Sequence, residues 1–144
     1  VIAEARSRGM PVITYDSDDP ESQRQSYVGT NNTFFGEQIG KVLDQLRPLG
    51  GKYVVISDST PNIKEREGGI ITALPEQWEL VEVKEILGNS SYGIEVMRQY
   101  AETIPDLEAF VVTYSGPMKE EEAWVQLASD FPEITLVCGG DGTV

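Results

Sequence analysis

At 144 residues, with 40% hydrophobic and 24% charged residues, the chain has the composition of one compact globular domain. Its formal net charge of −13 disfavours binding to nucleic acid or to an anionic membrane surface, because both carry phosphates that an acidic protein repels. The sequence has no histidine and a single cysteine, Cys138, which excludes an internal disulfide and removes the commonest zinc ligand. No run approaches about 18 apolar residues, so we expect no membrane-spanning segment.

Apolar spacing predicts alternating strands and helices along the chain. In chain order we expect a helix tail at 1–8, a strand at 11–15, an extended piece at 27–29, a helix at 35–46, a strand at 52–57, a helix ending at 74, a strand at 78–83, a helix at 90–104, a strand at 109–113, a helix capped at 115–117 and a strand at 134–138. The buried face of helix 35–46 should hold Phe35, Ile39, Val42, Leu43 and Leu46, and that of the last helix Trp124, Leu127 and Ala128.

This alternation, with short connections, predicts an α/β fold, a Rossmann-like parallel sheet with helices on both faces. Segment 16–32 is irregular and long for a strand-to-helix connection, so we interpret it as a crossing between two lobes. We expect the fold to be truncated at both ends, because the first and last strands would otherwise leave apolar faces uncovered.

Polar side chains follow nearly every expected strand. They are Asp16 and Ser17, residues 58–62, residues 89–91, Tyr114 and Ser115, and Asp141. The carboxyl ends of parallel strands meet at one edge of a sheet, where ligands bind, so we expect these groups to converge. Carboxylates, amides and hydroxyls in such an arrangement suit a neutral, polyhydroxylated ligand. For residues 16–19 the alternative is a solvated turn before Pro20.

Arg66 is the strongest single candidate for a ligand-binding residue. It lies one turn into the helix that follows strand 52–57, where its guanidinium can reach back towards the same edge. The alternative is an exposed arginine in a charged helical turn, paired with Asp58 or Glu67.

Five short motifs, in order, carry a family resemblance. They are residues 11–18 (PVITYDSD), 27–32 with Gly36, 51–56 (GKYVVI), 61–70 (PNIKEREGGI) and 139–143 (GGDGT). Together they resemble type I periplasmic sugar-binding proteins, the ribose-binding-protein-like solute receptors of ABC importers. The resemblance implies two lobes that close over a sugar: residues 1–30 would be the last βα pieces of the N-terminal lobe, and 31–144 most of the C-terminal lobe. Hinge crossings would lie near 29–32 and 139–141.

The resemblance also implies ligand-binding residues. The family's sugar-binding aspartate falls on Asp16, its helix arginine on Arg66 with Asn62 in the loop before it, and its last aspartate on Asp141. Two positions depart from the family: Ser17 replaces a common arginine, and Tyr114-Ser115-Gly116-Pro117 replaces an expected asparagine.

The implied function is that of the solute-binding component of an ABC-type importer, without catalysis, metal or cofactor. Its ligand would be a monosaccharide, its partner a transporter permease, and its location periplasmic or extracellular, with lipoprotein anchoring as one form. Two alternatives stay open. The same cleft occurs in the effector-binding core of a LacI-type regulator, and residues 139–143 resemble the GGDGT signature of lipid and NAD kinases.

Overall fold

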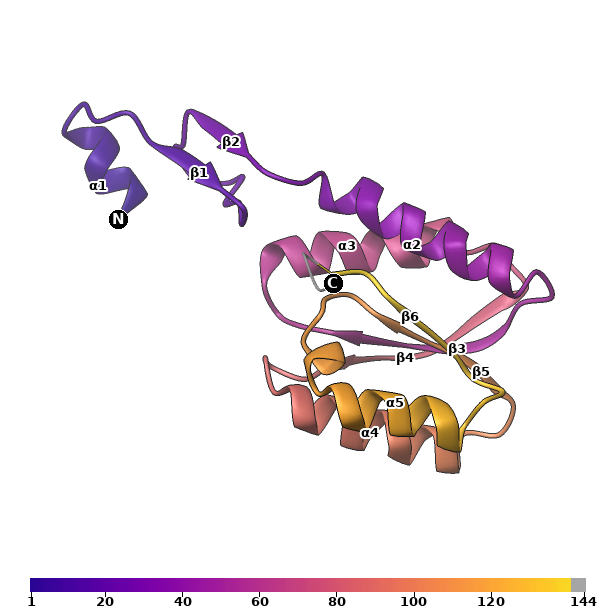
Figure 1. Ribbon diagram of the computed structural model, residues 1–144. Helices are drawn as coiled ribbons and strands as arrows, with labels where there is room; N and C mark the ends of the chain where they lie inside the picture. The colour runs from indigo at the N-terminus through magenta and orange to yellow at the C-terminus, as the bar shows by residue number, and fades with distance from the viewer. Residues whose placement is uncertain (141–144) are drawn as a thin grey trace.

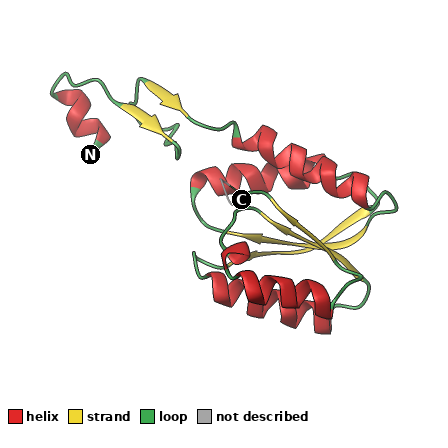
Figure 2. Ribbon diagram, viewed as in Figure 1, coloured by secondary structure: helices red, strands yellow, loops and turns green. Residues whose placement is uncertain are grey.

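A computed structural model describes residues 1–140 and shows strands and helices in the predicted alternation (Figures 1 and 2). The first elements are α1 (Ile2–Ser7), β1 (Ile13–Tyr15) and β2 (Ser26–Val28). Strands β1 and β2 form a parallel two-stranded sheet of their own. Figure 1 shows these three elements beyond the N-terminal end of the next helix, outside the layers of the larger unit.

The larger unit is built on a four-stranded parallel sheet. Its elements are α2 (Asn32–Leu46), β3 (Gly51–Ser57), α3 (Pro61–Ala73), β4 (Trp78–Glu85), α4 (Ser90–Thr103), β5 (Leu107–Val112), the 3-10 turn η1 (Pro117–Lys119), α5 (Glu121–Asp130) and β6 (Thr135–Cys138). The strand order is β4-β3-β5-β6, and every neighbouring pair is parallel. The four carboxyl ends therefore lie at one edge of the sheet.

Helices cover both faces of this sheet, as predicted (Figure 2). Helices α2 and α3 pack on one face, where Leu43 and Ile70 meet Val55 of the central strand β3. Helices α4 and α5 pack on the other, where Met97 and Leu127 share a cluster with strand residues such as Ile56. Alternate residues of β3 serve opposite faces because strand side chains alternate with a period of two.

Helices α2 and α3 approach so closely that only glycine fits at their contact. A Cβ on Gly36 would lie 2.0 Å from the carbonyl oxygen of Arg66, and a Cβ on Gly69 would lie 2.2 Å from that of Thr33. This contact brings the first turn of α2 against the turn of α3 that carries Arg66. The glycines thereby place the Asn32 side chain within reach of the arginine.

Two predicted helical faces are wrong in part. Val42 and Leu46 are 46% and 60% exposed, because the stripe that α2 buries is the narrower one formed by Phe35, Ile39 and Leu43. Ala128 is also exposed, since it lies about 100° around α5 from the buried Leu127 and outside the stripe that packs on the sheet.

Two predicted helix starts also differ from the structure. The last helix does not run on from the cap at 115–117: Pro117 opens the 3-10 turn η1, Glu120 leaves helical geometry at φ −83° and ψ 61°, and α5 then begins at Glu121. Asn62, expected in the loop before α3, lies inside the helix, because Pro61 occupies its first position.

Candidate functional site

The carboxyl-end edge of the large sheet brings together two of the predicted residues, Arg66 and Ser115. Ser115 follows β5 and is 8% exposed. A Cβ on Gly140 would lie 2.6 Å from the Cβ of Ser115, so the backbone after β6 runs directly against this serine. Asp141, the next predicted residue, lies outside the described residues. The described site is therefore centred on the ends of β5 and β6, with α3 delivering the arginine.

Arg66 is buried, with 1% of its surface exposed, so its interpretation as an exposed surface arginine is wrong. Its Nη1 donates to the carbonyl oxygen of Thr113 at 2.7 Å and lies 3.4 Å from that of Gly139. Its Nη2 donates to Oδ1 of Asn32 at 2.8 Å, and its guanidinium lies 4.5 Å from the centre of the Phe35 ring. A single cation thus joins the start of α2 to the ends of β5 and β6.

The carboxylates proposed as alternative partners of this arginine have other contacts. Glu67 accepts hydrogen bonds from Ser57 Oγ at 2.6 Å and from Lys64 Nζ at 2.9 Å. Lys64 also lies 2.6 Å from Glu85, and hydrogen bonds to these two glutamates raise the pKa of its ammonium group. Asp58 accepts from the backbone N–H of Gly88 at 2.6 Å, which ties the exit of β3 to the loop after β4.

Asn62 lies one helical turn before Arg66 and is half-buried on the same side of α3. Tyr114, next to Ser115, has its pKa raised to about 12 by burial and by the nearby carboxylate of Asp58. The thiol of Cys138 donates to the carbonyl oxygen of Tyr114 at 3.3 Å, and burial raises its pKa to about 11. Cys138 is thus a protonated packing residue, as its place in an apolar strand indicates.

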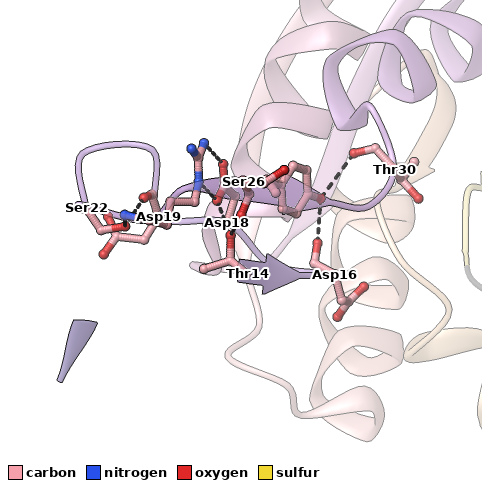
Figure 3. A network of polar contacts seen from close by, with 9 residues as sticks. Thr14, Asp16, Asp18, Asp19, Ser22, Ser26 and Thr30 are labelled. Carbon is pink, nitrogen blue, oxygen red and sulfur yellow. Dashed lines mark hydrogen bonds and ion pairs between the residues drawn. The ribbon is translucent and has the colours of Figure 1, made fainter. Parts of the chain in front are cut away.

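Asp16 and Ser17 lie in the separate β1–β2 unit. Asp16 has φ 63°, a left-handed conformation that is uncommon for residues other than glycine. Its N–H donates to Val28 O at 3.1 Å, and its carbonyl accepts from the Tyr27 hydroxyl at 2.7 Å, which leaves its exposed carboxylate pointing outward (Figure 3). Within residues 1–140, the hydrogen bonds of Asp16 and Ser17 all fall inside this unit, and none joins them to Arg66 or Ser115.

The residue of this site that sequence reasoning missed is Asn32. The segment 30–33 offers several N-cap candidates, and the structure divides their roles: Asn31 Oδ1 caps α2 by accepting from Phe34 N at 3.0 Å. The neighbouring Asn32, 2% exposed, turns inward to Arg66. The only sequence signal was the pair of adjacent asparagines, since one cap residue is enough for one helix.

The described part of the GGDGT segment packs tightly against the protein. A Cβ on Gly139 would lie 2.1 Å from Cδ1 of Ile39, and Gly140 is pressed against Ser115. Close packing therefore accounts for both glycines without a phosphate. Among residues 1–140 no cluster of three histidine, cysteine or acidic side chains is placed to hold a metal. Within the same residues, no helix has the length and apolar character needed to cross a membrane.

Comparison with known proteins identifies the family. Residues 1–144 match the family described as periplasmic binding protein domain. The chain therefore belongs to this family, which is non-catalytic. No curated protein matches the chain in sequence.

Solved structures show the same fold. A solute-binding protein of an ABC transporter from Burkholderia graminis, in complex with D-arabinose, is 23% identical over 94% of this chain and 49% of its own, with a TM-score of 0.82. A sugar-binding protein of a sugar ABC transporter from Bacillus halodurans is 28% identical over 94% and 48%, with a TM-score of 0.79. GanP, a glucose-galactose binding protein from Geobacillus stearothermophilus, is 23% identical over 99% and 52%, also with a TM-score of 0.79. The chain thus spans about half the length of these structures.

Proposed function

We propose that this periplasmic binding protein domain forms part of the sugar-binding component of an ABC importer and holds a monosaccharide by hydrogen bonds between two lobes. The observation that carries the proposal is Arg66, kept buried at the joined ends of β5 and β6 beside Ser115. Ligands of parallel α/β sheets bind at this edge. One similar structure is a complex with D-arabinose and another is a glucose-galactose binding protein, which supports a pentose or hexose as ligand.

The ligand-binding set would consist of Asp16, Ser17, Asn62, Arg66, Ser115 and Asp141. In this proposal residues 1–30 belong to one lobe and 31–144 to the other, with crossings near 29–32 and 139–141. Arg66 supports this division, because it contacts the first crossing through Asn32 and the second through the carbonyl of Gly139. Binding would favour the closed arrangement, since only that arrangement contacts the sugar from both sides.

The full-length protein would act in the periplasm or outside the cell, either freely or as a lipoprotein, and would deliver its sugar to a permease. The same cleft would serve a LacI-type regulator. The two roles differ in the coding sequence upstream: a leader or lipoprotein cysteine marks the importer, and a helix-turn-helix segment marks the regulator.

A thermal-shift screen of the full-length protein tests the proposal. The panel contains D-arabinose, D-glucose, D-galactose, an inositol, and ATP with magnesium. We expect one sugar to raise the melting temperature, because a ligand that binds only the folded state stabilises it. Stabilisation by ATP with magnesium and by no sugar would contradict the proposal.

A matched pair of variants then tests the site. Asparagine tolerates the left-handed backbone of Asp16, so Asp16→Asn removes the charge without changing the fold. Loss of a hydrogen bond to a charged group costs about 1.5–3 kcal/mol, so the Kd for the sugar should rise by about tenfold or more. Asp19→Asn is the control, an exposed carboxylate three residues away. Equal affinity of the two variants would remove Asp16 from the site.

A further inference from the structure

The loop between β1 and β2 is closed by an ion pair that the proposed function does not use. Asp18 accepts two hydrogen bonds from Arg24, with the guanidinium Nε facing one carboxylate oxygen and Nη2 facing the other (Figure 3). Thr14 Oγ1 of β1 donates to the same carboxylate at 2.7 Å. The two charged side chains are only 12% and 22% exposed, unlike the Glu4–Arg8 pair of α1, which is 66% and 69% exposed. We call Thr14, Asp18 and Arg24 the clasp.

The clasp lies two residues beyond Asp16, whose backbone is fixed from both sides. The N–H and carbonyl of Asp16 are held by Val28 and Tyr27, both on β2 or at its end. Partial burial and the nearby carboxylates of Glu65 and Asp18 raise the pKa of Tyr27, so its hydroxyl remains a donor. Beyond the clasp, the N–H of Gln25 donates to Val12 O at 2.8 Å. The loop between β1 and β2 is therefore held at its start by the backbone contacts of Asp16. It is held a second time by the clasp and by the hydrogen bond between Gln25 and Val12.

The side-chain atoms that Asp18 and Arg24 use in their ion pair are not available to bind a ligand. Both oxygens of Asp18 face Arg24, and Thr14 occupies one of them a second time. The planar fork of Arg24 matches the carboxylate in the two-bond geometry that fixes orientation as well as distance. Hydrogen bonding to Arg24 lowers the pKa of Asp18 to about 2, so the pair remains ionic at neutral and mildly acidic pH.

We propose that Asp18 and Arg24 are positioning residues, which hold the β1–β2 loop so that the outward carboxylate of Asp16 is pre-set for its ligand. The inference rests on the proposed function, in which Asp16 contacts the sugar. A loop that is already ordered loses less freedom when it binds, so the clasp strengthens binding without touching the ligand. Its effect therefore passes through the ligand-contacting residues of this loop, chiefly the charged Asp16 and to a lesser extent Ser17.

A double-mutant cycle in the full-length protein tests this. Calorimetry measures the Kd for the sugar in wild type, Arg24→Gln, Asp16→Asn and the double variant. We expect Arg24→Gln to weaken binding about five- to tenfold in the wild-type background and to have a much smaller effect beside Asp16→Asn, because residues that act together are not additive. Arg8→Gln, which breaks the exposed pair of α1, is the control and should leave the Kd unchanged.

Amide hydrogen exchange separates a local loosening of the loop from unfolding of the whole protein. In Arg24→Gln the amides of residues 16–25 should exchange faster, while those of β3 should not change. The charge-swapped variant Asp18→Arg with Arg24→Asp can form an ion pair again, so it should bind the sugar more tightly than Arg24→Gln does. Equal weakening by Arg24→Gln in both backgrounds, or an unchanged Kd despite a loosened loop, would overturn the positioning role. If Asp16→Asn itself leaves the Kd unchanged, the site assignment fails first and the positioning role fails with it.

Discussion

Replacing Arg66 with methionine would remove a buried cation and leave its oxygen partners behind. The two short hydrogen bonds, to Thr113 O at 2.7 Å and to Asn32 Oδ1 at 2.8 Å, would lose their donor. A buried acceptor left without a donor costs about 1–3 kcal/mol, and methionine fills most of the vacated volume. We therefore expect Arg66→Met to lower the free energy of unfolding by about 3 kcal/mol, even without ligand.

Urea unfolding followed by circular dichroism measures this effect. With a slope of about 1–3 kcal/mol per molar urea, the midpoint should fall by about 1–3 M. Lys64→Met is the matched control, because Lys64 lies on the same helix, is 38% exposed, and pairs with Glu67 and Glu85. Partly exposed pairs of this kind contribute about 0–1 kcal/mol. If Arg66→Met destabilised the protein no more than Lys64→Met, the account of Arg66 as a buried tie between α2, β5 and β6 would be wrong.

Three further predictions concern the scaffold. Gly36→Ala should lower the free energy of unfolding by about 2 kcal/mol or more, because its Cβ would lie 2.0 Å from a backbone oxygen of α3. Gly68→Ala, whose Cβ would have nothing within 4 Å, should raise that free energy by about 0.5–1 kcal/mol. Urea unfolding of the two variants measures both changes, which should have opposite signs. NMR titration of the Asp18 carboxyl should give a pKa of about 2 against an ordinary 3.8, and Arg24→Gln should return it towards 3.8. Because the pKa of Asp18 is lower in the folded state than in the unfolded state, the stability contributed by this pair is complete above pH 3.8 and is lost as the pH falls towards 2. A carboxyl of Asp18 that titrates at its ordinary pKa of 3.8 would contradict the ion pair. Cys138, with its pKa raised to about 11, should react slowly with a thiol reagent at pH 8 and rapidly once urea unfolds the chain; fast labelling of the folded protein would show the thiol to be accessible.

The fold was predictable because periodic signals dominate it. Apolar runs of strand length and helical spacing gave the alternation, and the alternation alone places the polar strand exits at one edge of a parallel sheet. The position of Arg66 near this edge was predictable for the same reason, since Arg66 lies one helical turn after such a strand exit. Its burial was not, because burial depends on Gly36 and Gly69, which let two helices touch, and on Asn32 turning inward.

The rest depends on contacts that have no period in the sequence. Asp18 and Arg24 lie six residues apart in an irregular loop, where no helical or strand spacing marks them as partners. Val42 and Leu46 lie at helical spacing beside buried residues of α2 and are still exposed, because the width of a buried stripe is set by the neighbouring elements rather than by the helix itself.

The central claim is that a sugar is held between two lobes, and small-angle X-ray scattering tests it most directly. The measurement compares the full-length protein alone with the same protein saturated by the sugar that the thermal-shift screen identifies. We predict a smaller radius of gyration in the presence of sugar, because closure brings the unit that carries Asp16 towards the edge that carries Arg66 and Ser115. An unchanged radius of gyration at saturation would contradict it.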